Sequence, residues 1–192
     1  MLKENKKIIG IWYIVSYTAI TIGVIIGSFY YIYKFNQSAE VKNYLDAYTN
    51  SLRSGMNFND LLKSSFKTYS LLFLVIVVAS LFKYGGFFTL FVLIRKGFIS
   101  AFTTLAMIEV YGSGGILLLT SLLPEILFII PVLALFSSIS IFYSQNKQKC
   151  EKRDKILYII FCGVIFTIFC GCVILEGLIT TTFMKWIAFK VT

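Results

Sequence analysis

The sequence predicts an all-α protein: a polytopic membrane bundle of about five transmembrane helices in one domain, residues 1–192. Apolar residues make up 58% of the chain and charged residues only 14%, whereas a soluble domain carries about a quarter charged residues. The mean hydropathy is +0.82. The longest uncharged stretch also exceeds the roughly 20 residues that a helix needs to cross a bilayer. These observations exclude an ordinary soluble domain.

The first predicted span covers residues 8–33, which carry no charge and follow three lysines. This arrangement resembles the start of a secretory signal. However, the apolar stretch exceeds the roughly 7–15 residues of a cleavable signal, and no small-residue cleavage site follows it. We therefore expect the segment to remain as the first transmembrane helix.

The outer segment, residues 34–67, is polar and mixed in charge, but it contains apolar residues at helical spacing. These residues are Val41, Tyr44, Leu45, Tyr48 and Leu52. The spacing predicts an amphipathic extracytoplasmic helix between the first two spans. Two interpretations stay open: the helix is a connector that rests on the membrane interface, or it is the surface that binds a partner protein.

The remaining apolar stretches predict four further spans. They cover residues 68–83, 87–110, 115–143 and 156–184. Charged residues interrupt the third stretch near its middle, so residues 87–94 form either the start of a full crossing or a re-entrant segment. Residues 144–155 form a basic loop between the last two spans.

The distribution of Lys and Arg predicts the orientation, because short cytoplasmic loops are enriched in these residues. Residues 1–7 contain three cations and the loop 144–155 contains five, whereas the longer outer segment contains five at lower density. We therefore expect a multi-pass protein of a bacterial cell membrane, with a cytoplasmic N-terminus and an external C-terminus. Cations that border the spans and meet anionic lipids account for the net charge of +9, so we expect no nucleic-acid partner.

Charged residues inside the spans predict an intramembrane polar network. The candidates are Arg95, Lys96, Glu125 and Glu176. A charge in the middle of the bilayer costs about 2.5–3.5 kcal/mol on insertion scales, so such residues normally face protein or water and pair. We expect Arg95 or Lys96 to pair with the two glutamates, and either cation fits this role.

Three residues beside these charges are candidate helix-break positions: Gly97, Pro124 and Pro131. Breaks in transmembrane helices are tolerated where helices pack together or line a cavity. The breaks and charges fit either a structural ion pair that fixes helix register or a broken-helix site for transport or proton relay. We favour the structural pair, because the chain has no histidine and no further charged group to extend a relay.

Catalytic and cofactor-binding motifs are missing from the sequence. It contains no Walker-type loop and no GxSxG, HExxH or CxxC motif. Cys170 and Cys172 lie about 200° apart on a helix, which is wrong for a shared metal. We therefore predict a protein that is not an enzyme, with no catalytic residues, no cofactor and no metal.

Three short regions carry a family resemblance. They are residues 91–103 with the Lys96-Gly97-Phe98 motif, residues 114–131 with the Leu-Pro and Ile-Pro pairs, and Glu176 with Gly177. In these regions and in the order of its spans, the chain resembles the stage II sporulation protein M family over nearly its whole length. One departure is Glu125 and Ile126, where the family pattern has Gln and Asn.

The resemblance implies a non-catalytic membrane scaffold of the sporulation engulfment machinery in a Gram-positive bacterium. Such a scaffold recruits a peptidoglycan-degrading amidase and a lytic transglycosylase during cell wall remodelling. Relatives found beside genes for circular bacteriocins imply an alternative: maturation, export or immunity together with an exporter. A third hypothesis, a small transporter with a buried charged site, rests on the intramembrane charges alone. The expected partners are membrane lipids and other membrane proteins, with a homo-oligomer as an alternative.

Overall fold

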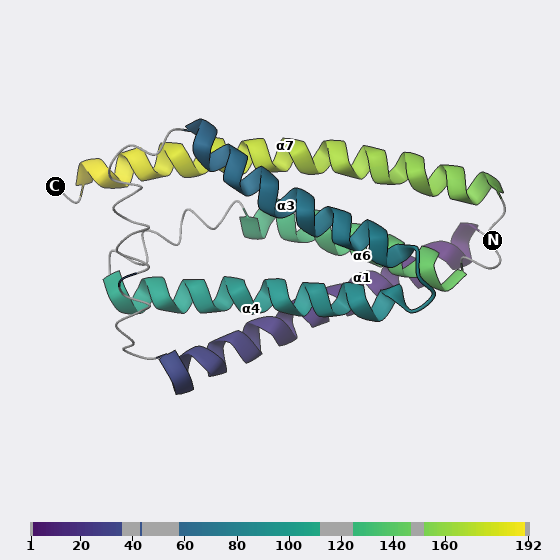
Figure 1. The fold of residues 1–192 in the computed structure, drawn as a ribbon, viewed down its shortest axis with the longest axis horizontal. Helices are drawn as coiled ribbons and strands as arrows, with labels where there is room; N and C mark the ends of the chain where they lie inside the picture. Colours follow the sequence, from purple (N-terminus) through teal and green to yellow (C-terminus); the bar gives the residue numbers. More distant parts are fainter. Residues whose placement is uncertain (1, 36–42, 44–57, 112–124, 147–151, 191–192) are drawn as a thin grey trace.

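The computed structural model describes residues 2–35, 43, 58–111, 125–146 and 152–190 (Figure 1). Within these ranges the chain is helical except at residues 81–84 and contains no strand. Five helices of the described chain are long and apolar enough to cross a membrane. The predicted fold class, a polytopic helical bundle, is therefore confirmed, and the protein is a multi-pass membrane protein.

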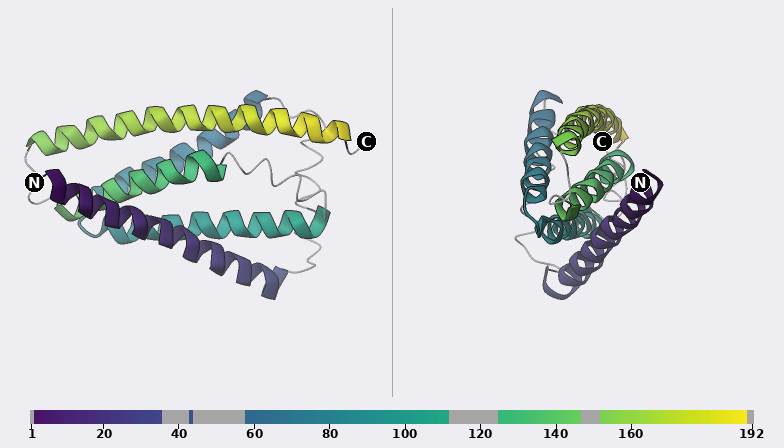
Figure 2. Two further views of the ribbon diagram at one scale, coloured as in Figure 1. Left: turned by 180° about the vertical axis from the view of Figure 1, so that it is seen from behind. Right: turned by 90° about the vertical axis from the view of Figure 1, so that its right-hand side faces the viewer.

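Seven helical elements follow one another along the described chain. They are α1 (Leu2–Tyr30), the π-helix η1 (Tyr31–Phe35), α3 (Phe58–Ser80), α4 (Gly85–Tyr111), the π-helix η3 (Glu125–Ile129), α6 (Ile130–Asn146) and α7 (Lys152–Lys190). The two ends of the chain lie at opposite ends of the bundle (Figures 1 and 2).

Helix α6 forms the centre of the bundle. It contacts α1, α3, α4 and α7, and in the end-on view of Figure 2 it lies among the other helices. It is also the span with the largest share of buried residues. Its buried Phe136 stacks on Phe73 of α3 with ring centroids 4.2 Å apart.

The outward faces of the other helices carry exposed isoleucine, leucine and phenylalanine side chains, as expected where helices meet lipid.

Helices α1 and α4 pack with their backbones in close contact. A Cβ atom added to Gly23 of α1 would lie 2.0 Å from the Ile94 carbonyl oxygen, and one added to Gly97 of α4 would lie 2.2 Å from the Ile20 carbonyl oxygen. Small residues allow this approach between membrane helices. Gly97 therefore belongs to a helix interface.

Our prediction of a helix break at Gly97 was wrong, because α4 runs without interruption from Gly85 to Tyr111. The same continuity excludes a re-entrant segment at residues 87–94. The physical reason is that glycine is a poor helix former in water, whereas in a membrane it serves as a contact point for a neighbouring helix.

Hydrogen bonds connect the turn between α3 and α4 to the end of α6. The Ser144 hydroxyl of α6 donates hydrogen bonds to the carbonyl oxygens of Phe82 and Lys83. Nearby, the Tyr158 hydroxyl of α7 donates to Ser80 Oγ at 2.8 Å and lies 3.1 Å from Ser140 Oγ. These contacts join α3, α6 and α7 at one end of the bundle.

The observed helix ends differ from the predicted span ends. Helix α3 extends from Phe58 to Ser80, and α7 extends from Lys152 to Lys190, so both continue beyond one or both ends of their apolar stretches. Hydropathy marks the part of a helix that lies in lipid, whereas backbone hydrogen bonding determines where the helix itself ends. The predicted amphipathic helix and the start of the predicted fourth span lie outside the described residues.

Candidate functional site

Four helical elements bring one cation, two carboxyl groups and one tyrosine together inside the bundle. The Lys96 ammonium group of α4 forms an ion pair with Oε1 of Glu125 in η3. The Lys96 nitrogen also lies 4.9 Å from the centre of the Tyr69 ring of α3, and the Tyr69 hydroxyl donates a 3.5 Å hydrogen bond to Oε1 of Glu176 in α7. We call Lys96, Glu125, Tyr69 and Glu176 the charge cluster.

The charge cluster is buried among apolar side chains. The side chains of Lys96 and Glu125 are only 13% and 10% exposed. Tyr69 packs edge-to-face against Phe169 with ring centroids 5.7 Å apart, and Ile129 and Val173 complete the same apolar cluster. Because such surroundings screen charges weakly, the attraction between Lys96 and Glu125 is stronger here than on a water-exposed surface.

A change of helix type positions Glu125. Glu125 is the first residue of the π-helix η3, which continues into α6 at Ile130. Pro131 follows directly and has no backbone N–H, so it cannot donate the hydrogen bond that would continue an α-helix through this region. Single π-turns within α-helices are frequent at functional sites. The other predicted break position, Pro124, lies outside the described residues.

One cation, Lys96, interacts with two carboxyl groups in the cluster. Glu176 interacts electrostatically with both Glu125 and Lys96. Its Oε2 atom is buried and has no hydrogen-bond partner among the residues that the structure describes. The cluster therefore links α3, α4, η3 and α7 through a small number of polar contacts, and the loss of any one of them leaves another buried polar group unpaired.

Arg95 does not join the charge cluster, although we had included it among the candidates. Successive residues point about 100° apart around a helix, so Arg95 lies on a different side of α4 from Lys96. It is exposed and forms no ion pair with any described residue. The structure therefore assigns the buried position to Lys96.

Tyr69 is the member that sequence reasoning missed. It lies in an apolar stretch that contains several other aromatic residues, so nothing in its immediate sequence distinguishes it. The only available signal is general: a tyrosine buried in a membrane span needs a partner for its hydroxyl. This signal would have suggested that the Tyr69 hydroxyl pairs with one of the intramembrane carboxyl groups.

The described residues contain no group of three histidine, cysteine or acidic side chains that is arranged to hold a metal ion. The predicted partner surface on Val41, Tyr44, Leu45, Tyr48 and Leu52 lies outside the described residues.

Comparison of the chain with protein-family profiles, curated proteins and solved structures gives no match.

Proposed function

We propose that this protein is a non-catalytic membrane scaffold, a helix bundle that holds other proteins at the membrane. The observation that carries the proposal is the ion pair between Lys96 and Glu125, which Tyr69 connects to Glu176. This cluster joins helices that are far apart in the sequence. A bundle with its register fixed in this way is suited to present constant surfaces to partners.

The burial of the cluster supports a structural role over transport. A transport site exchanges its substrate with water, whereas Lys96 and Glu125 are almost entirely enclosed and neutralise each other. Buried ion pairs contribute little net stability compared with apolar residues, but removal of one partner is strongly destabilising. Fixing helix register is the best-attested use of such a costly arrangement.

The resemblance to the stage II sporulation protein M family supports a more specific proposal. Lys96 and Glu176, which belong to regions that carry the resemblance, are also members of the charge cluster. By this resemblance, the protein lies in a bacterial cell membrane with a cytoplasmic N-terminus and recruits a wall amidase and a lytic transglycosylase during engulfment. The bacteriocin role, with an exporter as partner, is the alternative within the same family.

One observation favours a second candidate function, proton-coupled transport. The buried Oε2 atom of Glu176 has no hydrogen-bond partner among the described residues, and a carboxyl group with a free oxygen has an acceptor position for a proton. This candidate makes a different prediction from the scaffold: purified protein in lipid vesicles would carry a proton flux that Glu176→Gln abolishes.

Affinity purification from sporulating cells of the native host tests the scaffold. The tagged chain is extracted in a gentle detergent, and bound proteins are identified by mass spectrometry. We expect wall hydrolases with the native chain and with Gly163→Ala, a control at a position where an added Cβ meets nothing within 4 Å. Lys96→Met, which breaks the cluster, loses them. Absence of wall hydrolases from every sample contradicts the proposal, and exporter subunits in their place support the bacteriocin alternative.

A further inference from the structure

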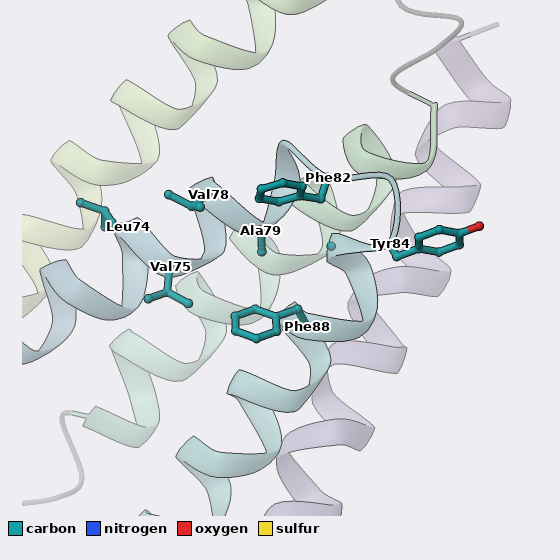
Figure 3. A pocket seen from close by; sticks show the side chains of 8 residues that line it. Leu74, Val75, Val78, Ala79, Phe82, Tyr84 and Phe88 are labelled. Atoms are coloured by element: carbon teal, nitrogen blue, oxygen red, sulfur yellow. The ribbon is translucent and has the colours of Figure 1, made fainter.

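An apolar groove opens between α3 and α4, close to the turn that joins them (Figure 3). Its volume is about 500 Å³, which is within the usual range of about 300–1,000 Å³ for pockets that bind ligands. Eight residues line it: Leu74, Val75, Val78, Ala79, Phe82, Tyr84, Gly85 and Phe88. Figure 3 shows Val75, Ala79 and Phe88 facing one another across the two helices, while the Tyr84 hydroxyl points away.

Beyond the groove, α4 carries a stripe of exposed residues that ends in a positive charge. Phe88, Phe91 and Arg95 are spaced i, i+3 and i+7, which places them on one face of a helix. Phe88 lines the groove, and Phe88 and Phe91 are 55% and 64% exposed. Arg95 is exposed as well. We call the groove and these three residues the outer face of α4.

Arg95 lies near the middle of the α4 span. The span of α4 runs from Gly85 to Glu109, and Arg95 is ten residues, about 15 Å, from its start. The hydrocarbon core is about 30 Å thick, so a helix that crosses it holds a residue near the middle of its span far from both surfaces. An unpaired charge at this depth is costly, and such residues are almost always paired within the membrane.

We propose that the outer face of α4 docks a transmembrane helix of another protein, one that carries an aspartate or glutamate near the middle of its span. That carboxylate pairs with Arg95. An apolar side chain of the same helix, about two turns nearer the turn between α3 and α4, fills the groove. This inference rests on the proposed scaffold function and names the chemistry of a partner.

A second copy of this chain fits the outer face poorly. A two-fold symmetric contact through this face would place Arg95 beside Arg95 of the other copy, because such interfaces pair the same surface with itself. A head-to-tail contact would need an exposed carboxylate at the same depth. Three glutamates of the described residues do not meet this requirement. Glu109 lies at the far end of the α4 span, and Glu125 and Glu176 belong to the charge cluster.

A phospholipid also fits the outer face less well than a helix does. An acyl chain can occupy an apolar groove, but the phosphate group of the lipid lies at the membrane surface, whereas Arg95 lies near the middle of the α4 span. Long basic side chains reach the surface readily only from near the ends of a helix. The lipid therefore leaves the charge unpaired, whereas a helix with a central carboxylate satisfies it.

Site-specific photo-crosslinking of the full chain in its native host tests the proposal. The photoreactive residue p-benzoylphenylalanine replaces Phe91 and, as a matched control, Val164, an exposed residue on α7. We expect position 91 to crosslink to a protein whose crosslinked peptide belongs to a transmembrane span with an acidic residue within one turn of its middle. Position 164 does not crosslink to that span.

Substitutions of Arg95 in the position 91 background make the test specific. Arg95→Lys keeps the charge and retains the crosslink, whereas Arg95→Leu lowers its yield by about five- to tenfold, in line with the loss of one interhelical polar contact. Four outcomes overturn the docking proposal: no crosslink at position 91, crosslinks to lipid or to a second copy only, a partner span without an acidic residue, or an unchanged yield with Arg95→Leu.

The scaffold proposal fails separately, when purification recovers no wall hydrolase. A carboxylate-bearing helix from any other protein would leave the docking inference standing in that case.

Discussion

Arg95 and Lys96 are neighbours in the chain, yet Lys96 is buried in an ion pair and Arg95 is exposed. The Lys96 side chain is 13% exposed and touches Glu125 and Tyr69. Arg95 points away from the cluster and is exposed at nearly the same depth of the span. The difference shows that depth in the bilayer does not by itself decide the role of a charge. The side of the helix on which the residue lies decides whether it meets a partner inside the bundle.

The comparison also separates two kinds of contribution to the protein. Lys96 is bound to partners from other helices, so its loss damages the bundle itself. Arg95 has no ion-pair partner among the described residues, so we expect its loss to leave the bundle intact. Substitutions at four positions distinguish these contributions by their effect on the free energy of unfolding.

The largest effect is expected for Lys96→Met. This substitution leaves the Glu125 carboxylate buried without its cation, and breaking a buried pair in this way costs about 3–5 kcal/mol. The free energy of unfolding in mixed micelles of detergent and dodecyl sulfate measures the loss. A decrease below about 1 kcal/mol, the range of exposed ion pairs, would show that Lys96 and Glu125 do not form a buried pair.

Gly97→Ala is expected to have the next largest effect, a loss of about 1–3 kcal/mol, which is typical of an overpacked contact. The added Cβ atom would lie 2.2 Å from the Ile20 carbonyl oxygen, so α1 and α4 have to separate. Gly163→Ala is the matched control, because a Cβ atom there meets nothing within 4 Å. Equal unfolding free energies for the two variants would contradict the close contact of α1 and α4.

Tyr69→Phe removes the hydroxyl that donates to Glu176 but keeps the ring beside Lys96. We expect a loss of about 0.5–1.5 kcal/mol, the net value of a typical hydrogen bond. Tyr69→Leu removes the ring as well and is expected to lose more. The link between Tyr69 and the rest of the cluster is disproved if both substitutions leave the unfolding free energy unchanged.

Arg95→Leu is expected to change the unfolding free energy of the purified protein by no more than about 0.5 kcal/mol, as for other substitutions that remove no contact. The same measurement in mixed micelles checks this value. A loss as large as that of Lys96→Met would mean that Arg95 stabilises the bundle, and the distinction between the two cations would fail.

Most of the fold was predictable from the sequence, because the length and hydropathy of a membrane helix are properties of a continuous segment. The charges at Lys96, Glu125 and Glu176 were recognisable for the same reason: they are rare within apolar stretches. Which of two adjacent cations is buried was not predictable, since that depends on how α4 is rotated against its neighbours. The rotation is set in part by Gly23 and Gly97 at the contact with α1.

The misinterpretation of Gly97 and the omission of Tyr69 have a common cause. Both residues owe their roles to a helix that is distant in the sequence: α1 for Gly97 and α7 for Tyr69. A glycine in a helix or a tyrosine in an apolar span has no local feature that identifies such a partner. Only the packing of the bundle supplies it.

A double-mutant cycle on Lys96 and Glu125 is the most direct test of the buried pair. The unfolding free energies of Lys96→Met, Glu125→Gln and the double variant are compared with that of the native chain in the same micelles. We predict a coupling energy of about 1–3 kcal/mol, as for residues in one ion-pair network, and a double variant that is more stable than Lys96→Met alone. Additive losses, with coupling below about 0.5 kcal/mol, would show that the two residues are independent and would contradict the account.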